Sequence, residues 1–224
     1  MPITLANLAD RAQNILADSG AAIWPQATIE EWVNAAIRDY SQRNPRAIVT
    51  TINASTADYQ YDLPATFRDA LRVEYPSGNT PPTYLTQRDH TDPNFYAYTD
   101  AYDIIRHNDV GTVDEIIIST SPTTGQSIKV YHTADHDSAL ASGGTVTVPL
   151  DHHNTLILYV IWQAFTNRHM EEAAAPTTAS SLLTEQLANS AQKARDDYLA
   201  ALAATTRAPS ARRAWRMDPH DPIY

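Results

Sequence analysis

The segment from Leu156 to Phe165 constrains the fold of this chain most, because its residues are apolar on almost every side of a helix. A helix without a polar face is buried on most of its sides. Asp151, a few residues earlier, is a reasonable N-cap residue. We therefore predict that a helix following Asp151 lies at the centre of a helical bundle.

Three other segments have the pattern of amphipathic helices that could surround this central helix. Residues 5–18 carry apolar side chains at helical spacing after Thr4, a plausible N-cap. The capping box Thr28–Glu31 predicts a second helix, which ends before Pro45 because the residue before a proline resists the α-helical conformation. A last helix over residues 182–204 is expected to bury a stripe formed by Leu183, Leu187, Ala191, Ala194, Tyr198 and Leu202.

The middle of the chain has the composition of strands. Residues 48–52 are mostly β-branched, and Ile116–Ile118 are apolar on both faces, as in a central strand. Residues 128–132 alternate, so that isoleucine, valine and histidine share one face. After the break at Gly143–Gly144, residues 146–148 alternate in the same way and predict one more strand.

These patterns together predict an α+β fold in three parts. The helical bundle comprises residues 1–46 and 150–206, a β-rich insertion spans residues 47–149, and an extended C-terminal arm spans residues 207–224. The chain has no cysteine, which excludes a disulfide scaffold and thiolate metal sites. No secretory signal is visible, and no apolar run approaches the roughly 18 residues of a membrane span, so we expect no membrane partner.

The charge balance differs between the arm and the rest of the chain. The whole sequence carries 16 Lys and Arg against 26 Asp and Glu, which makes it a poor candidate for wrapping nucleic acid. The arm has the opposite sign, with four Arg against two Asp. An arm of this charge could in principle contact phosphate, but the acidic remainder of the chain opposes docking on nucleic acid.

The arm is interpreted as a peptide that docks onto a neighbouring subunit or a partner, the alternative being a disordered or artefactual end. Arginine, tryptophan and methionine are enriched at protein interfaces, and the three prolines of the arm keep it extended. The candidate partner-binding residues are Arg207, Arg212, Arg213, Trp215, Arg216, Met217, Ile223 and Tyr224.

Histidines provide the best prospect for catalysis or metal binding, but their pattern is unspecific. His132, His136, His152 and His153, together with nearby aspartates, could meet in loops that flank residues 146–148. The sequence has no HExxH motif, and its six glycines form no phosphate-binding pattern. We therefore predict no catalytic residue, metal or cofactor, and four structural or solvated histidines. Replacing His136 and His153 with alanine is expected to leave assembly unchanged within about 1 kcal/mol, as for ordinary surface residues.

Several stretches also carry a likeness to a known family. They are Thr28–Tyr40, Tyr61–Pro64 with Leu71–Tyr75, Glu115–Ile118 followed by Ser121–Pro122 and Ile128–Tyr131, Val148–Leu150 leading into residues 156–164, and Glu185–Tyr198. In these stretches, and in the order of its predicted elements, the chain resembles the head-to-tail adaptor (connector) proteins of tailed bacteriophages. These motifs are patterns of structural residues and contain no catalytic signature.

The resemblance implies a structural virion protein rather than an enzyme. It implies a homo-oligomeric ring, twelvefold by family likeness, that is assembled in the bacterial host cytoplasm and lies in the virion neck. The C-terminal arms would dock onto the portal protein, the opposite face would receive the next tail or neck protein, and DNA would pass through the lumen without specific binding. The acidic composition agrees with this role, because a negative lumen repels phosphate.

Two other functions remain open at this point. One is another phage structural protein, such as a tail-completion or baseplate protein. The other is a histidine-dependent metalloenzyme, which a metal assay of the purified protein would distinguish from both structural roles.

Overall fold

The computed structural model describes residues 3–55, 58–107, 112–123, 125–174 and 180–205. Within these residues it contains four α-helices and one curled seven-stranded sheet, so the prediction of an α+β fold is confirmed. The chain divides into two compact units. One, the helical unit, comprises Met1–Asn44 and His136–Tyr224, and the other, the sheet unit, comprises Pro45–Asp135.

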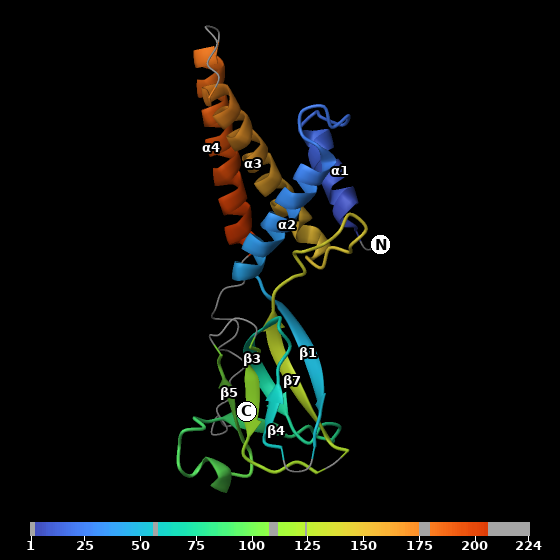
Figure 1. Cartoon of the computed structure of the whole chain (residues 1–224), viewed down its shortest axis with the longest axis vertical. Helices are drawn as coiled ribbons and strands as arrows, with labels where there is room; N and C mark the ends of the chain where they lie inside the picture. Colours follow the sequence, from blue (N-terminus) through green and yellow to red (C-terminus); the bar gives the residue numbers. More distant parts are fainter. Residues whose placement is uncertain (1–2, 56–57, 108–111, 124, 175–179, 206–224) are drawn as a thin grey trace, which may run out of the picture. The chain divides into compact units, whose positions relative to one another are not determined.

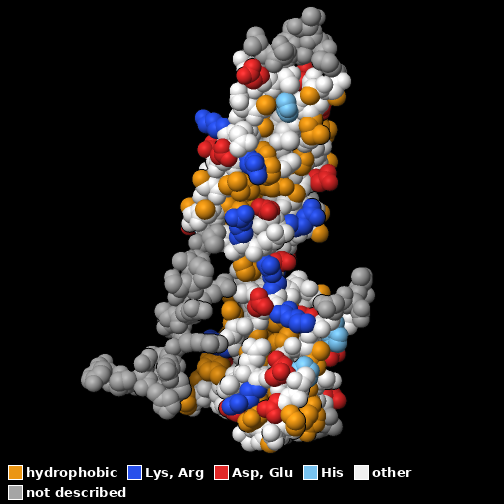
Figure 2. All heavy atoms as spheres, turned by 90° about the vertical axis from the view of Figure 1, so that its left-hand side faces the viewer, with side chains coloured by type: hydrophobic (Ala, Val, Ile, Leu, Met, Phe, Trp, Pro, Cys, Tyr) orange, Lys and Arg blue, Asp and Glu red, His pale blue; other side chains and the backbone are white. Residues whose placement is uncertain are grey.

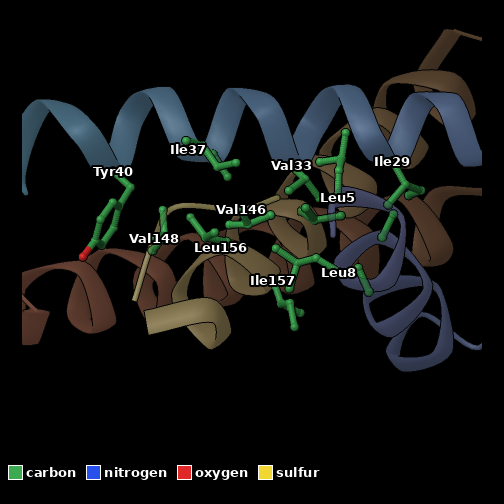
Figure 3. Close-up of a cluster of buried hydrophobic side chains, with 14 of the residues drawn as sticks. Leu5, Leu8, Ile29, Val33, Ile37, Tyr40, Val146, Val148, Leu156 and Ile157 are labelled. Atoms are coloured by element: carbon green, nitrogen blue, oxygen red, sulfur yellow. The ribbon is translucent and has the colours of Figure 1, made fainter. Parts of the chain in front are cut away.

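The helical unit contains four helices: α1 (Leu5–Ile15), α2 (Gln26–Arg43), α3 (His153–Ala174) and α4 (Ser180–Thr205) (Figure 1). Helix α3 packs against each of the other three, as expected for the apolar segment that begins at Leu156. The buried side chains of α1, α2 and α3 meet in one core (Figure 3). Its members include Leu5, Leu8, Ile29, Val33, Ile37, Tyr40, Leu156, Ile157, Val160, Tyr198 and Leu202.

Residues 136–149, which the sequence analysis included in the β-rich insertion, belong to the helical unit. Val146 and Val148 are buried in its core, where Figure 3 shows them between α2 and α3. The predicted strand over residues 146–148 is wrong, because this segment makes only an isolated bridge between Thr4 and Thr145. Alternating valines here reflect one-sided packing of an extended chain on helices, since burial of every second residue does not require a neighbouring strand.

Two predicted helix starts are also wrong. Helix α2 begins at Gln26 with Pro25 at its N-cap, and no side chain caps it, so Thr28 lies inside the first turn. A proline suits a helix start because its fixed φ is preorganised and its missing N–H is not needed there. Asp151 lies in a 3-10 turn, η2 (Leu150–His152), and α3 starts after it at His153.

The stripe predicted for α4 is buried only in the second half of the helix. Ala194, Tyr198 and Leu202 are buried, whereas Leu183 is 43% exposed and Leu187 is half-buried. The first half of α4 lies along the outer half of α3, away from α1 and α2 (Figure 1). A single neighbouring helix covers only part of the apolar stripe, so the periodicity of Leu183 and Leu187 is not matched by burial.

The sheet unit has the strand order β1-β7-β3-β4-β5-β6-β2. Its strands are β1 (Arg46–Asn53), β2 (Gln60–Asp62), β3 (Phe67–Glu74), β4 (Tyr84–Gln87), β5 (Ala101–Ile105), β6 (Glu115–Ile118) and β7 (Ser127–Ala134), and a 3-10 turn, η1 (Phe95–Ala97), precedes β5. All pairs are antiparallel except β4 with β5. Sequence patterns predicted the segments of β1, β6 and β7 but not β4, whose four residues lack the apolar run that marks β6.

The core of the sheet unit forms on one face of these strands. Ile128, Val130 and His132 of β7 are fully buried, as their alternation predicted. They are covered by side chains from β3, β5 and β6, among them Phe67, Val73, Tyr102, Ile116 and Ile118.

Candidate interaction sites

The predicted docking residues of the arm, from Arg207 to Tyr224, lie outside the described residues. The structure does describe the point from which the arm starts. Helix α4 ends at Thr205, whose hydroxyl oxygen accepts a hydrogen bond from the side-chain amide of Asn44 at 3.1 Å. Asn44 is the C-cap residue of α2, so Thr205, the last described residue before the arm, lies beside the end of α2.

His136 is the first residue of the helical unit after the sheet unit, which ends at Asp135. Its ring is buried, with Nε2 3.2 Å from the carbonyl oxygen of Asn44 and Nδ1 3.1 Å from the hydroxyl of Thr147. Its backbone N–H donates to Ser41 Oγ at 3.1 Å. A carbonyl only accepts, so this geometry assigns the ring proton to Nε2 and makes Nδ1 an acceptor for Thr147.

The four histidines singled out in the sequence do not form one cluster. His132 lies in the sheet unit, where its Nε2 contacts Thr50 Oγ1 at 3.0 Å, and the other three lie in the helical unit. Nδ1 of His152 bonds the Tyr40 hydroxyl, and Nε2 of His153 lies 2.9 Å from the Val148 carbonyl oxygen. In each of these four histidines at least one ring nitrogen makes a hydrogen bond to another residue of the protein.

The assumption that His136 and His153 are ordinary surface residues is wrong. Both side chains are about 95% buried, at 5% and 4% exposure, so neither is a surface residue. Removing a buried hydrogen-bonding group leaves its partners unsatisfied, which costs about 1–3 kcal/mol. The earlier figure assumed surface positions, which the spacing of these histidines could not test.

Among the described residues, one group has the spacing of metal ligands: Asp89, His90 and Asp103. His90 Nδ1 lies 2.7 Å from Asp103 Oδ2, and Asp89 Oδ1 accepts hydrogen bonds from the hydroxyl and N–H of Thr91. The side-chain and backbone hydrogen bonds from Thr91 lower the pKa of Asp89. A hydrogen-bonded turn accounts for this group, which the sequence analysis did not single out because Asp103 is distant in the chain.

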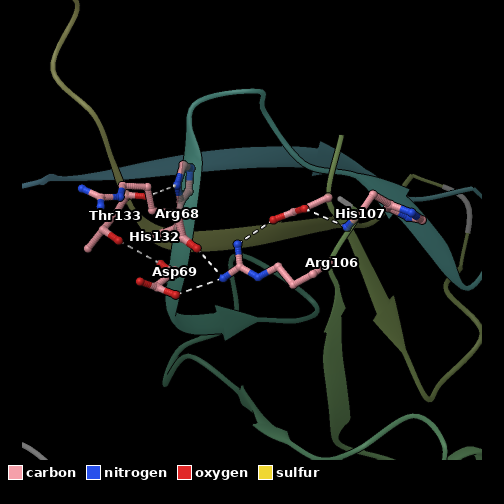
Figure 4. A network of polar contacts seen from close by, with 7 residues as sticks. Arg68, Asp69, Arg106, His107, His132 and Thr133 are labelled. Atoms are coloured by element: carbon pink, nitrogen blue, oxygen red, sulfur yellow. Dashed lines mark hydrogen bonds and ion pairs between the residues drawn. The ribbon is translucent and has the colours of Figure 1, made fainter. Parts of the chain in front are cut away.

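A second polar network lies on the sheet unit around Arg106 (Figure 4). The guanidinium bonds Asp114 at 2.6 Å and Asp69 at 2.9 Å, and it also donates to the carbonyl oxygen of Arg68. Arg106 follows β5 while Asp69 lies on β3, so the network ties two strands that are not neighbours in the sheet. Its ions are partly exposed, so each pair contributes at most about 1 kcal/mol.

An arginine between two aromatic rings marks the exposed face of the sheet. The Arg72 guanidinium lies 4.1 Å from the ring centre of Tyr131 and 4.9 Å from that of Tyr84. Val49 of β1 is opposite Tyr131 in the register and is 52% exposed. Strands β1, β7, β3 and β4 thus share an outer surface of mixed aromatic, aliphatic and cationic character.

The helical unit has a similarly mixed surface. Figure 2 shows apolar side chains on the visible face of its helices, with acidic and basic side chains interspersed among them. Several ions pair within one helix, such as Arg168 with Glu171 at 3.2 Å and with Glu172 at 2.8 Å. Among the described residues no helix combines the length and apolar character that a membrane crossing needs.

These mixed surfaces resemble those that bind other proteins. A family model described as SU10 adaptor protein matches residues 3–217. The chain belongs to the SU10 adaptor protein family. This is a family of phage head-to-tail adaptors, so the resemblance found in the sequence is confirmed. No curated protein matches the chain.

The match extends over both units of the adaptor and into the arm as far as Met217. It therefore includes six of the eight candidate docking residues, Arg207, Arg212, Arg213, Trp215, Arg216 and Met217, and leaves out Ile223 and Tyr224. The adaptor is a structural phage protein.

Proposed function

We propose that this protein forms a closed homo-oligomeric ring, twelvefold by likeness to phage connectors, between the portal and the tail in the virion neck. One face of the ring binds the portal protein and the other binds the next tail or neck protein. The genome passes through the lumen without specific binding. The observation that carries this proposal is the family match over residues 3–217.

The charge of the chain supports passage of DNA without adhesion. Residues 45–135 carry six Lys and Arg against twelve Asp and Glu, and residues 1–44 with 136–205 carry the same numbers. Both units are therefore acidic, and the surface of either would repel phosphate if it lined the lumen. Passage does not depend on which unit faces the DNA.

The arm supports attachment of the ring. It reverses the charge of the units, and its Trp215 and Met217 are residue types that anchor interfaces. Arg212, Arg213 and Arg216 can bind carboxylates with two hydrogen bonds each, which lysine cannot match. The arm docks through these residues onto the portal or onto a neighbouring adaptor.

Electron microscopy of the purified protein, alone and with its portal protein, tests the proposal together with mass spectrometry of virions. We expect ring particles when the portal is present and a fixed number of adaptor copies per virion. A chain that stays monomeric within virions or is absent from them would overturn the proposal. Copies located at the tail tip would instead support a baseplate protein, and stoichiometric zinc with hydrolytic activity would support the metalloenzyme.

A further inference from the structure

Strand β1 is an open edge of the sheet. In the part of the chain that the structure describes, β1 pairs with β7 alone, over eight residues from Arg46 to Asn53 in an unbroken antiparallel register. Among the described residues, no backbone group of residues 47–53 makes a hydrogen bond on the other side of the strand. Figure 1 shows β1 along the margin of the sheet. The strand therefore presents a row of unpaired donors and acceptors.

This edge has none of the features with which proteins usually prevent pairing with another strand. Charged residues, prolines, bulges and short length are the common protections. Residues 47–53 contain no charge, proline or glycine, and the register of β1 with β7 has no bulge. By contrast β2, at the opposite edge, has only three residues. An unprotected edge of this length is a template for strand addition.

The inward side chains of β1 are also incompletely covered. Ile48, Thr50 and Ile52 are half-buried, although they face the same side as their partners His132, Val130 and Ile128 on β7. Those three partners are each 0% exposed. The difference arises because β7 has a strand on both sides and β1 has only one. A further strand beside β1 would bury the exposed parts of Ile48 and Ile52.

The arm contains a segment that suits this edge. Pro209 and Pro219 bracket the nine residues 210–218, which contain no proline and can therefore donate every ladder hydrogen bond. Trp215 and Met217 are two residues apart and would point to the same face of a strand. That face can cover two successive side chains of the row Ile48, Thr50 and Ile52 with an aromatic and a thioether side chain.

We propose that residues 210–218 of one copy add as a strand to the free edge of β1 in a second copy. This inference rests on the proposed ring, and it names the surface that receives the arm. The donor and acceptor surfaces are different parts of the chain, so the contact is heterologous, and repeated heterologous contacts can close a ring. The four residues 206–209 tether this segment to Thr205 and span at most roughly 14 Å, so the receiving β1 edge of the second copy must lie close to the end of α4 in the donor copy.

The absence of cysteine allows a direct test by cross-linking of full-length chains. One chain carries Val49→Cys on β1, and a second carries Ser210→Cys in the arm, which would lie on the face opposite Trp215 and Met217 and thus on the same side of the sheet as Val49. The two chains are mixed and treated with a short thiol cross-linker. Leu71→Cys replaces Val49→Cys as the matched control, because Leu71 is equally exposed at 49% but lies on β3, an interior strand. We expect at least about tenfold more mixed dimer with Val49→Cys than with the control, because docking raises the effective concentration of the two thiols.

A proline in the arm tests strand pairing itself. Ala211→Pro and Ala214→Pro are added separately to the Ser210→Cys chain, with Ala211→Ser and Ala214→Ser as the controls. Successive N–H groups of a strand point to opposite sides, so one of the two prolines removes a donor to β1, and both keep the arginines and Trp215. We expect the cross-link to fall to the Leu71→Cys level with at least one of the two prolines and to persist with either serine. A cross-link unaffected by either proline would overturn strand addition.

Two other results would also overturn the inference. One is no mixed dimer above the Leu71→Cys control, whatever the oligomeric state. The other is a cross-link that forms only within one chain carrying both cysteines, which would place the arm on its own β1. Rings that persist without the cross-link would refute this inference and leave the proposed function intact. Absence of the protein from virions would refute the proposed function and leave the cross-link standing.

Discussion

Nε2 of His136 lies 3.2 Å from the carbonyl oxygen of Asn44, so the last residue before the sheet unit is joined to the first residue after it. Both residues belong to the helical unit, and the bond satisfies a carbonyl at the C-terminal end of α2. The backbone N–H of His136 donates to the Ser41 hydroxyl oxygen, and the Ser41 hydroxyl in turn donates to the Ile37 carbonyl oxygen. These hydrogen bonds join the two segments of the helical unit at the point where the sheet unit separates them in the sequence.

These bonds predict that His136→Ala lowers the free energy of unfolding by about 1–3 kcal/mol, because the half-buried Asn44 carbonyl and Thr147 hydroxyl lose their hydrogen bonds to the ring. Thr147→Val should lose about half as much, since it removes the bond to Nδ1 and the weak bond from the Asp137 N–H but keeps the bond from Nε2 to Asn44. Urea denaturation followed by circular dichroism measures both changes. His169→Ala is the control. His169 lies on the outer half of α3, and its ring makes one hydrogen bond, with the Thr184 carbonyl of α4. A midpoint for His136→Ala equal to that of the wild type would contradict the assignment.

A second prediction concerns Tyr198 of α4, which is 1% exposed and donates its hydroxyl to Asp39 of α2. Burial, and then the hydrogen bond and charge of Asp39, raise the pKa of Tyr198 above its ordinary value of 10.0. A raised pKa favours the protonated form in the folded state, so this stabilisation is complete below pH 10 and is lost as the pH rises further.

Tyr198→Phe should therefore cost about 1 kcal/mol at neutral pH, because the bond to a partly exposed carboxylate is lost. The variant should also show a weaker decline of stability above pH 10 than the wild type. Thermal melts across the alkaline range measure this difference. Tyr96→Phe is the control, since Tyr96 is 57% exposed. Parallel alkaline declines for wild type and Tyr198→Phe would refute the role of this tyrosine.

A third prediction concerns Asp18 in the connection between α1 and α2. Its carboxylate accepts hydrogen bonds from the backbone N–H groups of Trp24, Ile23 and Ala22, at 2.8 to 3.1 Å. The bond from Trp24 is the largest cause that lowers the pKa of Asp18 below its ordinary value of 3.8. The stabilisation is therefore present above pH 3.8 and is lost as the pH falls through the lowered value.

Asp18→Asn should lower the melting temperature at neutral pH by several degrees, because a neutral amide oxygen is a weaker acceptor than a carboxylate. The difference between variant and wild type should shrink below pH 3.8. Asp10→Asn is the control, because Asp10 accepts only a side-chain bond from Gln26. A difference that stays constant down to strongly acidic pH would show that the charge of Asp18 is not involved.

The fourth prediction compares two leucines of α4. Leu202→Ala should cost about 2–5 kcal/mol, because the side chain is 0% exposed and its removal leaves a cavity. Leu183→Ala should cost less than about 0.5 kcal/mol in the free protein, since Leu183 is 43% exposed. Urea denaturation of each variant measures its loss of stability. Equal costs would mean that the outer half of the α3–α4 pair is covered in solution.

The fifth prediction concerns the arm. Deletion of residues 207–224 should leave the thermal melt unchanged and abolish attachment to the virion, because the core of α4 ends at Leu202. Trp215→Ala should weaken each arm by about 30-fold or more, as expected for a truncated interface anchor of roughly 2–4 kcal/mol. Trp215→Phe is the control that keeps an aromatic ring. Normal virion incorporation without the arm would remove it from the attachment mechanism.

Patterns within short segments were sufficient for the type of most elements. The apolar run at Leu156 predicted α3, and the alternation of Ile128, Val130 and His132 predicted the buried face of β7. They were insufficient where a strand has no repeating apolar pattern, as in β4, and where two residues could each cap the same helix, as Pro25 and Thr28 could for α2. The docking residues of the arm remain a prediction from composition.

By itself, the sequence determined the α+β class, the place of the strands between helices, the acidic character of both units and the family likeness, because all of these depend on local periodicity, composition and residue order. Only the tertiary structure decided that residues 146–148 pack on helices, that His136 is buried against Asn44, that Leu183 is exposed and that β1 has an open edge. Burial and strand pairing depend on which segments meet in space, and no periodicity within a segment contains that information.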